Sequence, residues 1–197
     1  YGAEAQLYFN YNTNNLMNKD LTAAQKALVK DYNASLFKGT VPVSSSKVGN
    51  FTATSTGFSG KSASVSFEGA FAVNYYFTPN CDIDGNITLY YWNPADYAKV
   101  SSLAPSNASG KLTMEKQANG SYWAQVSGIP AKELDETYYV AAFYTSENEL
   151  RCTGVIAYSL SKYCMNNASG TSTMNGLARA TAMYGYHAQT YFNSIAN

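Results

Sequence analysis

Side chains that could do acid–base or nucleophilic chemistry are few and scattered in this sequence. The single histidine, His187, lies in a stretch with helical periodicity. A general base needs a nucleophile or a substrate proton within hydrogen-bond reach, and the sequence ties His187 to neither. The carboxylates of Glu133, Asp135 and Glu136 fall together in a predicted turn. No Gly-x-Ser-x-Gly, His-Glu-x-x-His, phosphate-loop or dinucleotide motif is present. We therefore expect a protein that is not an enzyme and has no cofactor.

One acidic stretch resembles the first half of a calcium-binding loop. Asp82, Asp84 and Asn86 alternate around Gly85, as the first ligands of an EF-hand loop do. The glutamate that completes such a loop is missing, because the chain continues into Ile87–Tyr90, a segment typical of a strand. Asp-Gly and Gly-Asn pairs also form turns for backbone reasons alone. We expect a turn without a metal ion, and these three residues are the calcium candidate.

Aromatic residues beside side-chain amides give the clearest binding signal. Alternation along Ile87–Asn93 and Tyr122–Val126 places both tryptophans on faces turned away from the core-like residues. Sugar rings stack their C–H faces on aromatic rings, and their hydroxyls bond to amides. The predicted ligand-binding residues are Trp92, Trp123, Tyr90, Asn93, Tyr97 and Gln125. Alternatively, this face lies beneath the terminal helices, whose own aromatic residues need a surface to pack against.

The two ends of the chain carry the same motif. Residues 1–10 read YGAEAQLYFN and residues 184–193 read YGYHAQTYFN, with seven of ten positions identical. The second copy ends a longer helical pattern, in which apolar residues recur at spacings of three and four. If the copies are equivalent, the first is also the tail of a longer helix. We therefore expect that helix to begin upstream of residue 1, and we expect the two matching helices to pack together.

Between the two copies the hydrophobic period changes from helical to alternating and back. A capping box at Thr22–Gln25 predicts a helix to about Phe37, ended by Gly39. Strands are expected at Phe51–Thr56, Ser62–Phe67, Phe71–Thr78, Ile87–Asn93, Lys111–Lys116, Tyr122–Val126, Thr137–Tyr144 and Leu150–Ala157. The insertion Pro94–Gly110 is a loop of the kind that carries binding, with a helical turn at its start. Further helices are expected at Tyr158–Asn166 and at Thr173–Ser194, the second capped by Ser172, Thr173 or Asn175.

These elements predict an α+β fold, in which an antiparallel β-sandwich is flanked by N- and C-terminal helices that pack together. We expect one domain, 1–197, with N-terminal helices in 1–40, the sandwich in 48–157 and C-terminal helices in 158–197. The three cysteines, Cys81, Cys152 and Cys164, cannot all pair within one chain. Either one disulfide forms, for which Cys152 and Cys164 are candidates, or all three are buried thiols.

Charge is scarce and balanced in this chain. Thirteen basic residues match thirteen acidic ones, and the charged fraction of 13% is about half the usual level. This balance argues against nucleic acid as a partner, and no apolar run of about 18 residues is present to span a membrane. The 18 tyrosines are typical of secreted and sugar-binding surfaces, although strands also favour tyrosine. The expected partners are a polysaccharide or cell-surface glycan and neighbouring modules of the same chain.

Four stretches of the sequence, YGAEAQLYFNYNTNNLMN, FAVNYYFTP, VSGIPAKELDETYYV and ARATAMYGYHAQTYFN, together resemble a domain of secreted and surface proteins of anaerobic Gram-positive gut bacteria. Such domains have a Y-G-x-x-A-Q-x-Y-F helix, a β region with an A-K-x-L-D turn and a second aromatic helix. The resemblance covers nearly the whole chain and supplies no site residues. It implies an extracellular module, secreted or attached to the cell surface, of a multi-domain or cellulosome-type protein that often carries dockerin or Ig-like modules. Carbohydrate binding is the expected role, and a structural or adhesive spacer that binds a protein partner or a neighbouring module is the alternative.

Overall fold

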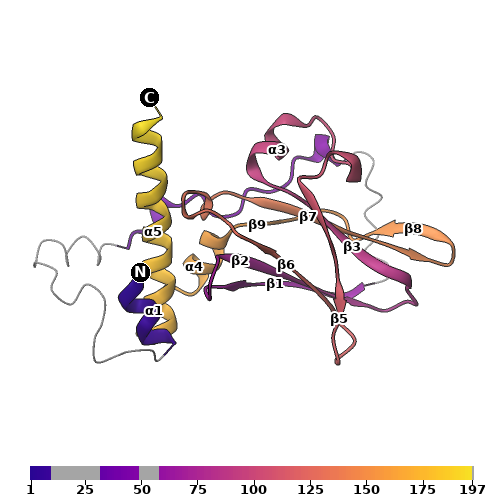
Figure 1. Ribbon diagram of the computed structural model, residues 1–197, viewed down its shortest axis with the longest axis horizontal. Coiled ribbons are helices and arrows are strands. Elements are labelled where there is room, and N and C mark those ends of the chain that lie inside the picture. The colour runs from indigo at the N-terminus through magenta and orange to yellow at the C-terminus, as the bar shows by residue number, and fades with distance from the viewer. Residues whose placement is uncertain (10–31, 49–57, 197) are drawn as a thin grey trace, which may run out of the picture. The chain divides into compact units, whose positions relative to one another are not determined.

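The computed structural model describes residues 1–9, 32–48 and 58–196. It confirms the predicted α+β fold, with two antiparallel sheets and a set of helices (Figure 1). The chain divides into two compact units, each assembled from separate stretches of sequence. The helical unit comprises residues 1–40, 129–136 and 159–197, and the sandwich unit comprises residues 41–128 and 137–158. The prediction of a single domain, 1–197, stays a prediction.

The sandwich unit contains two sheets within the described residues. The first sheet has the strand order β1 (Phe58–Ser66), β2 (Ala72–Pro79), β6 (Tyr122–Ser127) and β5 (Glu115–Lys116). The second sheet has the order β4 (Gly110–Thr113), β3 (Asp84–Trp92), β7 (Tyr138–Ser146) and β8 (Glu149–Cys152), and β9 (Ile156–Tyr158) also pairs with β7. All of these pairs are antiparallel. Short helical turns in this unit are η2 (Ser45–Lys47), α3 (Pro94–Lys99) and η3 (Pro105–Asn107).

Alternating apolar residues build the core between the two sheets. Val73, Tyr75 and Phe77 of β2 point inward and are at most 1% exposed. The ring of Phe58 meets the ring of Phe77 edge to face at 5.8 Å and that of Tyr144 at 5.0 Å. Because Tyr144 belongs to β7, these contacts join the first sheet to the second. The packed pair of antiparallel sheets is the predicted sandwich.

Most of the predicted strands are confirmed, and the differences have local causes. The predicted strand Phe51–Thr56 lies outside the described residues. The predicted strand Lys111–Lys116 is divided at the buried Met114 into β4 and β5, which belong to different sheets. The predicted strand Leu150–Ala157 is interrupted around Gly154, whose φ of +73° lies in the left-handed region. Where a chain passes from one sheet to the other, as between β4 and β5, the alternation of its side chains is not interrupted. The sequence pattern therefore predicts one continuous strand there.

The sequences Asn119-Gly120 and Thr145–Asn148 predict hairpin turns between neighbouring strands, and both hairpins are formed. Between β5 and β6, Gly120 has a φ of +83°, and the Gln117 N–H donates to the Ser121 carbonyl at 2.7 Å. Between β7 and β8, Glu147 and Asn148 have φ values of 54° and 63°. Two consecutive residues with positive φ are typical of the two-residue turn whose twist matches that of the strands.

The helical unit contains α1 (Gly2–Tyr8), η1 (Ala34–Leu36), η4 (Ala131–Glu133), α4 (Leu160–Asn166) and α5 (Thr173–Ile195). The two helices that carry the motif pack together, as predicted (Figure 1). The Tyr1 ring stacks on the Tyr184 ring with centroids 5.4 Å apart. At the start of α5, Ser172 is the N-cap and forms a capping box with Asn175. Of the candidates for this cap, Ser172 and Asn175 therefore share the role.

The helix predicted from Thr22 is wrong at its end, and its earlier part lies outside the described residues. From Tyr32 to Phe37 the chain contains only the 3₁₀ turn η1, which is capped by the side chain of Asn33. Gly39 has the positive φ of a helix C-cap, +67°, but it ends no helix. Its N–H donates instead to the buried Asp135 carboxylate at 3.1 Å.

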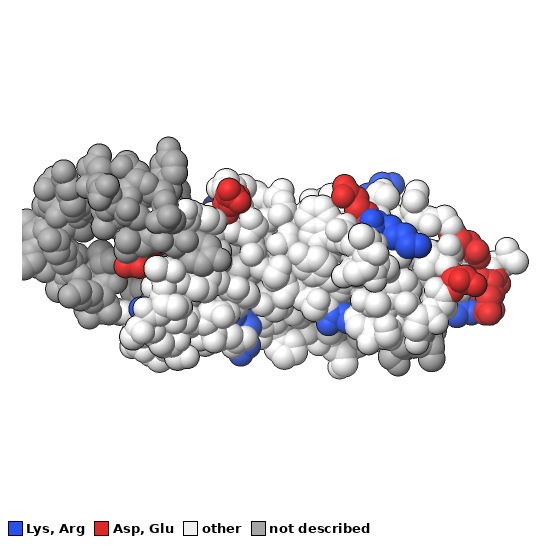
Figure 2. Space-filling view, turned by 90° about the horizontal axis from the view of Figure 1, so that it is seen from below, with Lys and Arg blue, Asp and Glu red and all other residues white. Residues whose placement is uncertain are grey.

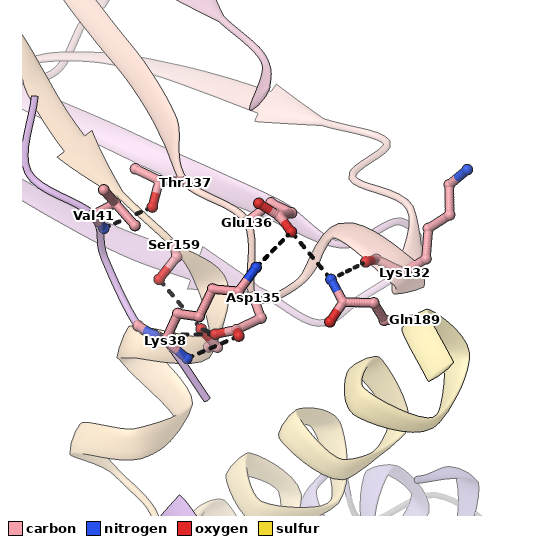
Figure 3. Close-up of polar contacts among 10 residues, drawn as sticks. Lys38, Val41, Lys132, Asp135, Glu136, Thr137, Ser159 and Gln189 are labelled. Atoms are coloured by element: carbon pink, nitrogen blue, oxygen red, sulfur yellow. Dashed lines mark hydrogen bonds and ion pairs between the residues drawn. The ribbon is translucent and has the colours of Figure 1, made fainter. Parts of the chain in front are cut away.

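The Asp135 carboxylate joins three separate segments of the helical unit (Figure 3). It accepts hydrogen bonds from the Lys38 N–H at 2.9 Å, from the Gly39 N–H, and from the Ser161 hydroxyl at 2.6 Å. The Ser161 N–H also donates to the Leu134 carbonyl at 2.8 Å. Charge-assisted hydrogen bonds of this kind compensate the desolvation of a buried carboxylate. Segment 38–39, turn 131–136 and helix α4 therefore meet at one side chain.

Helix α5 packs on the same turn through a glycine. A Cβ atom added to Gly185 would lie 2.9 Å from Cβ of Leu134 and 3.3 Å from the Ala131 carbonyl oxygen. One helical turn later, the Gln189 amide donates to the Glu136 carboxylate at 3.1 Å. Only glycine allows the helix backbone to approach the turn this closely.

All three cysteines are thiols in the structure, so the candidate disulfide between Cys152 and Cys164 is not formed. Cys152 and Cys164 are buried and Cys81 is half-buried. Burial raises the pKa of the Cys164 thiol to about 12, which keeps it protonated and unreactive at neutral pH. The thiol alternative therefore holds, although Cys81 is not fully buried.

We predict that Asp135→Asn lowers the free energy of unfolding by about 2–3 kcal/mol, because it removes the charge and leaves buried N–H groups poorly paired. The adjacent Glu136→Gln is the matched control, since the ion pair between Glu136 and Lys38 is exposed and should contribute less than about 1 kcal/mol. Urea denaturation followed by circular dichroism measures both. Equal effects of the two substitutions would contradict a central role for Asp135.

We predict that Tyr75→Phe leaves stability unchanged or raises it by up to about 1 kcal/mol, because the Tyr75 hydroxyl is buried without a hydrogen-bond partner in the described part of the chain. The same desolvation raises the pKa of this phenol far above its usual range. Thermal and urea unfolding of the variant test this. A loss of more than about 1 kcal/mol would show that the hydroxyl has a partner in solution.

Candidate functional site

The outward face of the first sheet gathers aromatic rings and amides. Residues next to the inward Val73, Tyr75 and Phe77 face outward, which places the buried Asn74 (8% exposed) and the half-buried Tyr76 on the outward face of β2. In the β2–β6 register Asn74 lies opposite Gln125, and Tyr76 lies opposite Trp123. Together with two residues near β5 they line an open hollow of ≈ 340 Å³, called here the outer-face hollow. Its lining residues are Asn74, Tyr76, Glu115, Gln117, Trp123 and Gln125.

Hydrogen bonds across the strands fix the amides of this hollow. The Gln125 amide donates to the Asn74 side-chain carbonyl at 2.9 Å, and the Asn74 amide donates to the Ser64 hydroxyl at 3.2 Å. These two hydrogen bonds connect side chains of β6, β2 and β1 and fix the orientation of both amide groups. Within the described residues the Gln125 side-chain carbonyl and the Trp123 indole N–H make no hydrogen bond. One acceptor and one donor are therefore left for a ligand beside an aromatic ring.

The hollow carries little charge. Glu115 is the one formally charged residue among those that line it. The neighbouring Lys116 lies with its ammonium 5.9 Å from the centroid of the Tyr122 ring. In the view of Figure 2, charged side chains are few over most of the surface, and several Asp and Glu side chains gather at the right-hand end. The site offers no cluster of cations for phosphate, sulfate or uronic acid groups and suits an uncharged ligand.

The predicted face shared by Trp92 and Trp123 is wrong. Trp123 belongs to the first sheet, whereas Trp92 belongs to the second sheet and is 0% exposed. The Trp92 ring lies in a core cluster with Leu103 and Tyr139, and its indole N–H donates to the Asn107 side chain at 2.9 Å. Residues of the insertion Pro94–Gly110 thus cover the outer face of β3 at this point. Of the six predicted residues, only Trp123 and Gln125 meet in one site.

Asn93 and Tyr97 hold the insertion in place. The Asn93 side chain caps α3 by accepting a hydrogen bond from the Asp96 N–H at 2.8 Å. The Tyr97 ring stacks on the Tyr139 ring with centroids 3.6 Å apart, and the Tyr97 hydroxyl accepts from the Ser44 N–H. The hydrogen bond from the Ser109 hydroxyl, aided by Lys99, lowers the pKa of the Asp96 carboxyl. These contacts give both residues a structural role, and their predicted part in ligand binding stays a prediction.

A second hollow of ≈ 390 Å³ lies on the second sheet, and the predicted binding loop forms part of it. The lining residues are Tyr90, Pro105, Ser106, Ala108, Gly110 and Lys111. The one aromatic ring in this lining, Tyr90, meets Phe143 edge to face at 5.3 Å. This hollow offers one aromatic ring and no side-chain amide, so it has fewer of the groups that recognise a sugar than the outer-face hollow has.

The calcium candidate has the wrong backbone shape. Asp84 and Asn86 belong to strand β3, and the irregularity in its pairing with β7 falls between Asp84 and Thr88. An EF-hand loop has to wrap its ligands around one point, which an extended strand does not do. In the part of the chain that the structure describes, no three His, Cys, Asp or Glu side chains are grouped to hold a metal ion. No helix among the same residues is long and apolar enough to cross a membrane.

Four residues of the outer-face hollow were missed by the sequence analysis: Asn74, Tyr76, Glu115 and Gln117. The alternation in AVNYYFTP does place Asn74 and Tyr76 on the outward face of a strand. What the alternation does not contain is the β2–β6 register that brings them to Trp123 and Gln125. Glu115 and Gln117 depend on the break at Met114, which carries the chain from the second sheet to the first.

No protein-family model matches this chain, and no curated protein matches it. Among solved structures, the chain is similar to the Br derivative of BhCBM56, a carbohydrate-binding module, with a TM-score of 0.34 and 14% sequence identity. The similarity covers 50% of this chain and 90% of that chain. A likeness at this level carries no argument about a ligand. The resemblance to the gut-bacterial surface domain stays a prediction.

We predict that the two tryptophans differ sharply in their access to solvent. In Trp123→Phe, the remaining emission from the buried Trp92 should shift to shorter wavelength and resist quenching by acrylamide. In Trp92→Phe, the remaining emission should lie at longer wavelength and be quenched readily, because Trp123 lines an open hollow. Similar quenching of the two variants, with circular dichroism confirming that both are folded, would contradict the burial of Trp92.

Proposed function

We propose that this protein is a non-catalytic module that binds an uncharged carbohydrate chain in the outer-face hollow. The observation that carries the proposal is the β2–β6 register, which pairs Tyr76 with Trp123 and Asn74 with Gln125, so that both aromatic residues and both amides line one hollow. Aromatic rings can stack on the C–H face of a sugar, and side-chain amides can form hydrogen bonds with its hydroxyls. The hollow supplies both kinds of group.

Each group at the site has a definite part in this recognition. The Trp123 ring supplies the stacking surface, and its indole N–H supplies a donor. The Gln125 carbonyl supplies an acceptor held in place by the bond from its own amide to Asn74. The Glu115 carboxylate accepts hydrogen bonds from sugar hydroxyls and repels anionic polysaccharides. Because the strands are rigidly paired, these groups are arranged before the ligand arrives.

We place this module outside the cell, as part of a multi-domain surface or cellulosome-type protein. The support is the composition, poor in charge and rich in tyrosine, and the resemblance of its motifs to secreted modules of gut bacteria. Detection of the natural full-length protein in the medium or on intact cells tests this placement.

We predict that Trp123→Ala weakens binding of a neutral polysaccharide by about 10- to 100-fold, because it removes an aromatic stacking surface that contributes about 1.5–3 kcal/mol when buried. Affinity electrophoresis against neutral plant and host polysaccharides first identifies a ligand, and titration calorimetry with its oligosaccharides then measures the affinity.

Two controls locate the effect. Tyr90→Ala removes the aromatic ring of the hollow on the second sheet and should leave binding unchanged. Gln125→Ala should weaken binding about 5- to 20-fold, since it removes one hydrogen-bonding group together with its bond to Asn74. If the folded protein migrates unretarded on every polysaccharide, or if Trp123→Ala binds as the unmodified chain does, carbohydrate binding at this hollow is wrong.

The alternative function is a structural or adhesive spacer that binds a neighbouring module or another protein. The observation that favours it lies in the helical unit, where Tyr191 and Ile195 at the end of α5 are 61% and 60% exposed. Large apolar side chains grouped on one helix surface are typical of a protein contact. This role needs no polysaccharide and is separated from the first by the same electrophoresis.

A further inference from the structure

The side-chain polar atoms of the outer-face hollow that make no hydrogen bond are mostly acceptors. Among the residues that the structure describes, both carboxylate oxygens of Glu115 and the side-chain carbonyl oxygens of Gln117 and Gln125 have no partner. In the same residues the Trp123 indole N–H is an unpaired donor, and the Tyr76 hydroxyl is able to donate or accept. The hollow therefore offers a ligand more acceptors than donors.

Each amide nitrogen of the lining already donates one hydrogen bond within the protein. Gln125 donates to the Asn74 side chain at 2.9 Å, and Asn74 donates to Ser64 at 3.2 Å. The Gln117 amide donates to the backbone carbonyl of Glu115 at 3.3 Å. Because a backbone carbonyl only accepts, this bond also identifies which end of the Gln117 amide is nitrogen and which is oxygen. The Gln117 oxygen is thus left for a ligand.

Strand β5 and the turn after it place these acceptors next to the stacking surface. Glu115 is paired with Trp123 in the β5–β6 register, and residues paired across antiparallel strands project from the same face of the sheet. Gln117 follows two residues later, and its backbone N–H donates to the Ser121 carbonyl at 2.7 Å, which holds it at the hairpin. A sugar ring stacked on Trp123 therefore meets acceptor oxygens on its β5 side.

A hydroxyl group and an O-acetyl group differ in what they offer to these acceptors. A sugar hydroxyl can donate a hydrogen bond to a carboxylate or an amide oxygen, and the bond to the charged acceptor is the stronger one. Acetylation replaces the hydroxyl hydrogen with an acyl group, and the oxygens of the resulting ester only accept. An ester beside Glu115 therefore leaves the carboxylate without a donor and brings negative oxygen atoms together.

We infer that the outer-face hollow selects neutral polysaccharides with free hydroxyls over their O-acetylated forms, and that Glu115 determines this preference. The inference rests on the proposed function, because it concerns the same class of ligand at the same site. Stacking on Trp123 contributes to the binding of both forms, whereas Glu115 discriminates between them. On an acetylated polysaccharide, removal of the acetyl groups by an esterase reaction would then have to precede tight binding.

The shape of the hollow makes hydrogen bonding, and not size, the basis of this selection. The hollow of ≈ 340 Å³ is open to solvent, so an added acetyl group can project away from the protein. The preference is also distinct from the repulsion of anionic polysaccharides, because an acetyl ester carries no charge. What changes on acetylation is the loss of a donor opposite an acceptor.

The test compares two forms of each polysaccharide. A glucomannan, an arabinoxylan, a β-glucan and glycogen are each prepared without acetyl groups and after partial acetylation, and affinity electrophoresis of the full chain measures the binding of both forms. Acetylation should weaken binding about 5- to 20-fold, the effect of a lost hydrogen bond and an unpaired acceptor. Equal or stronger retardation by the acetylated form overturns the preference and leaves the proposed function standing. No retardation by either form of any of them contradicts the proposed function, and this inference with it.

A matched pair of substitutions separates hydrogen bonding from a steric effect. Glu115→Gln keeps the size of the side chain and supplies an N–H that can donate to an ester, so the two forms should bind within about 2-fold of each other. Glu68→Gln removes the same charge from an exposed residue between β1 and β2, outside the hollow, and should keep the full difference. The ratio of the two affinities is the readout, because damage to the fold would weaken the binding of both forms alike. A ratio that Glu115→Gln leaves unchanged overturns the role of Glu115.

Discussion

The helical unit depends on the buried carboxylate of Asp135. This side chain holds segment 38–39, its own turn and α4 by three hydrogen bonds, and α5 then packs on that turn through Gly185. The segments come from three distant parts of the sequence, between which the chain leaves for the sandwich unit and returns. A hydrophobic contact would bring such segments together without fixing their alignment. A carboxylate with three directed donors fixes it, because every donor left unpaired in a buried place costs free energy.

The sandwich unit positions its site by a different constraint, the strict alternation of side chains along paired strands. Once Val73, Tyr75 and Phe77 are committed to the core, Asn74 and Tyr76 have to face outward, and the register then decides what lies beside them. A shift of one residue would exchange the rings and amides for core residues. The outer-face hollow is therefore a consequence of core packing and needs no additional folding element. The same logic explains why Trp92 has no such role. Its face of β3 is covered by the insertion, and its indole N–H pairs with Asn107 inside the cluster.

The sequence predicts most of the secondary-structure elements of this protein, but it predicts poorly which elements contact one another. Period-two alternation located most of the described strands, and Asn119-Gly120 and 145–148 located two hairpins, because these signals are local. Trp92 was assigned to an outward face correctly, but a periodicity of two does not say whether another segment covers that face. Asp135 was noticed only as part of an acidic turn, since its donors lie more than 90 residues before it or on a later helix. The division at Met114 was hidden because both halves are extended. In each case the missing information is a long-range pairing.

The terminal motif also shows that sequence predicts elements better than the contacts between them. Seven identical residues were sufficient to predict that both copies are helical and that they pack together, and both predictions are confirmed. Identity did not predict that Tyr1 and Glu4 would make the contacts in one copy and Gly185 and Gln189 in the other. A helix has several faces, and its sequence encodes all of them at once. Where only one face is needed, the residues on the other faces are expected to differ between the copies. Here tyrosine, glycine, glutamine and phenylalanine recur in both copies, yet the described contacts of the two copies involve different positions of the motif, so the motif by itself does not say which face of each helix is used.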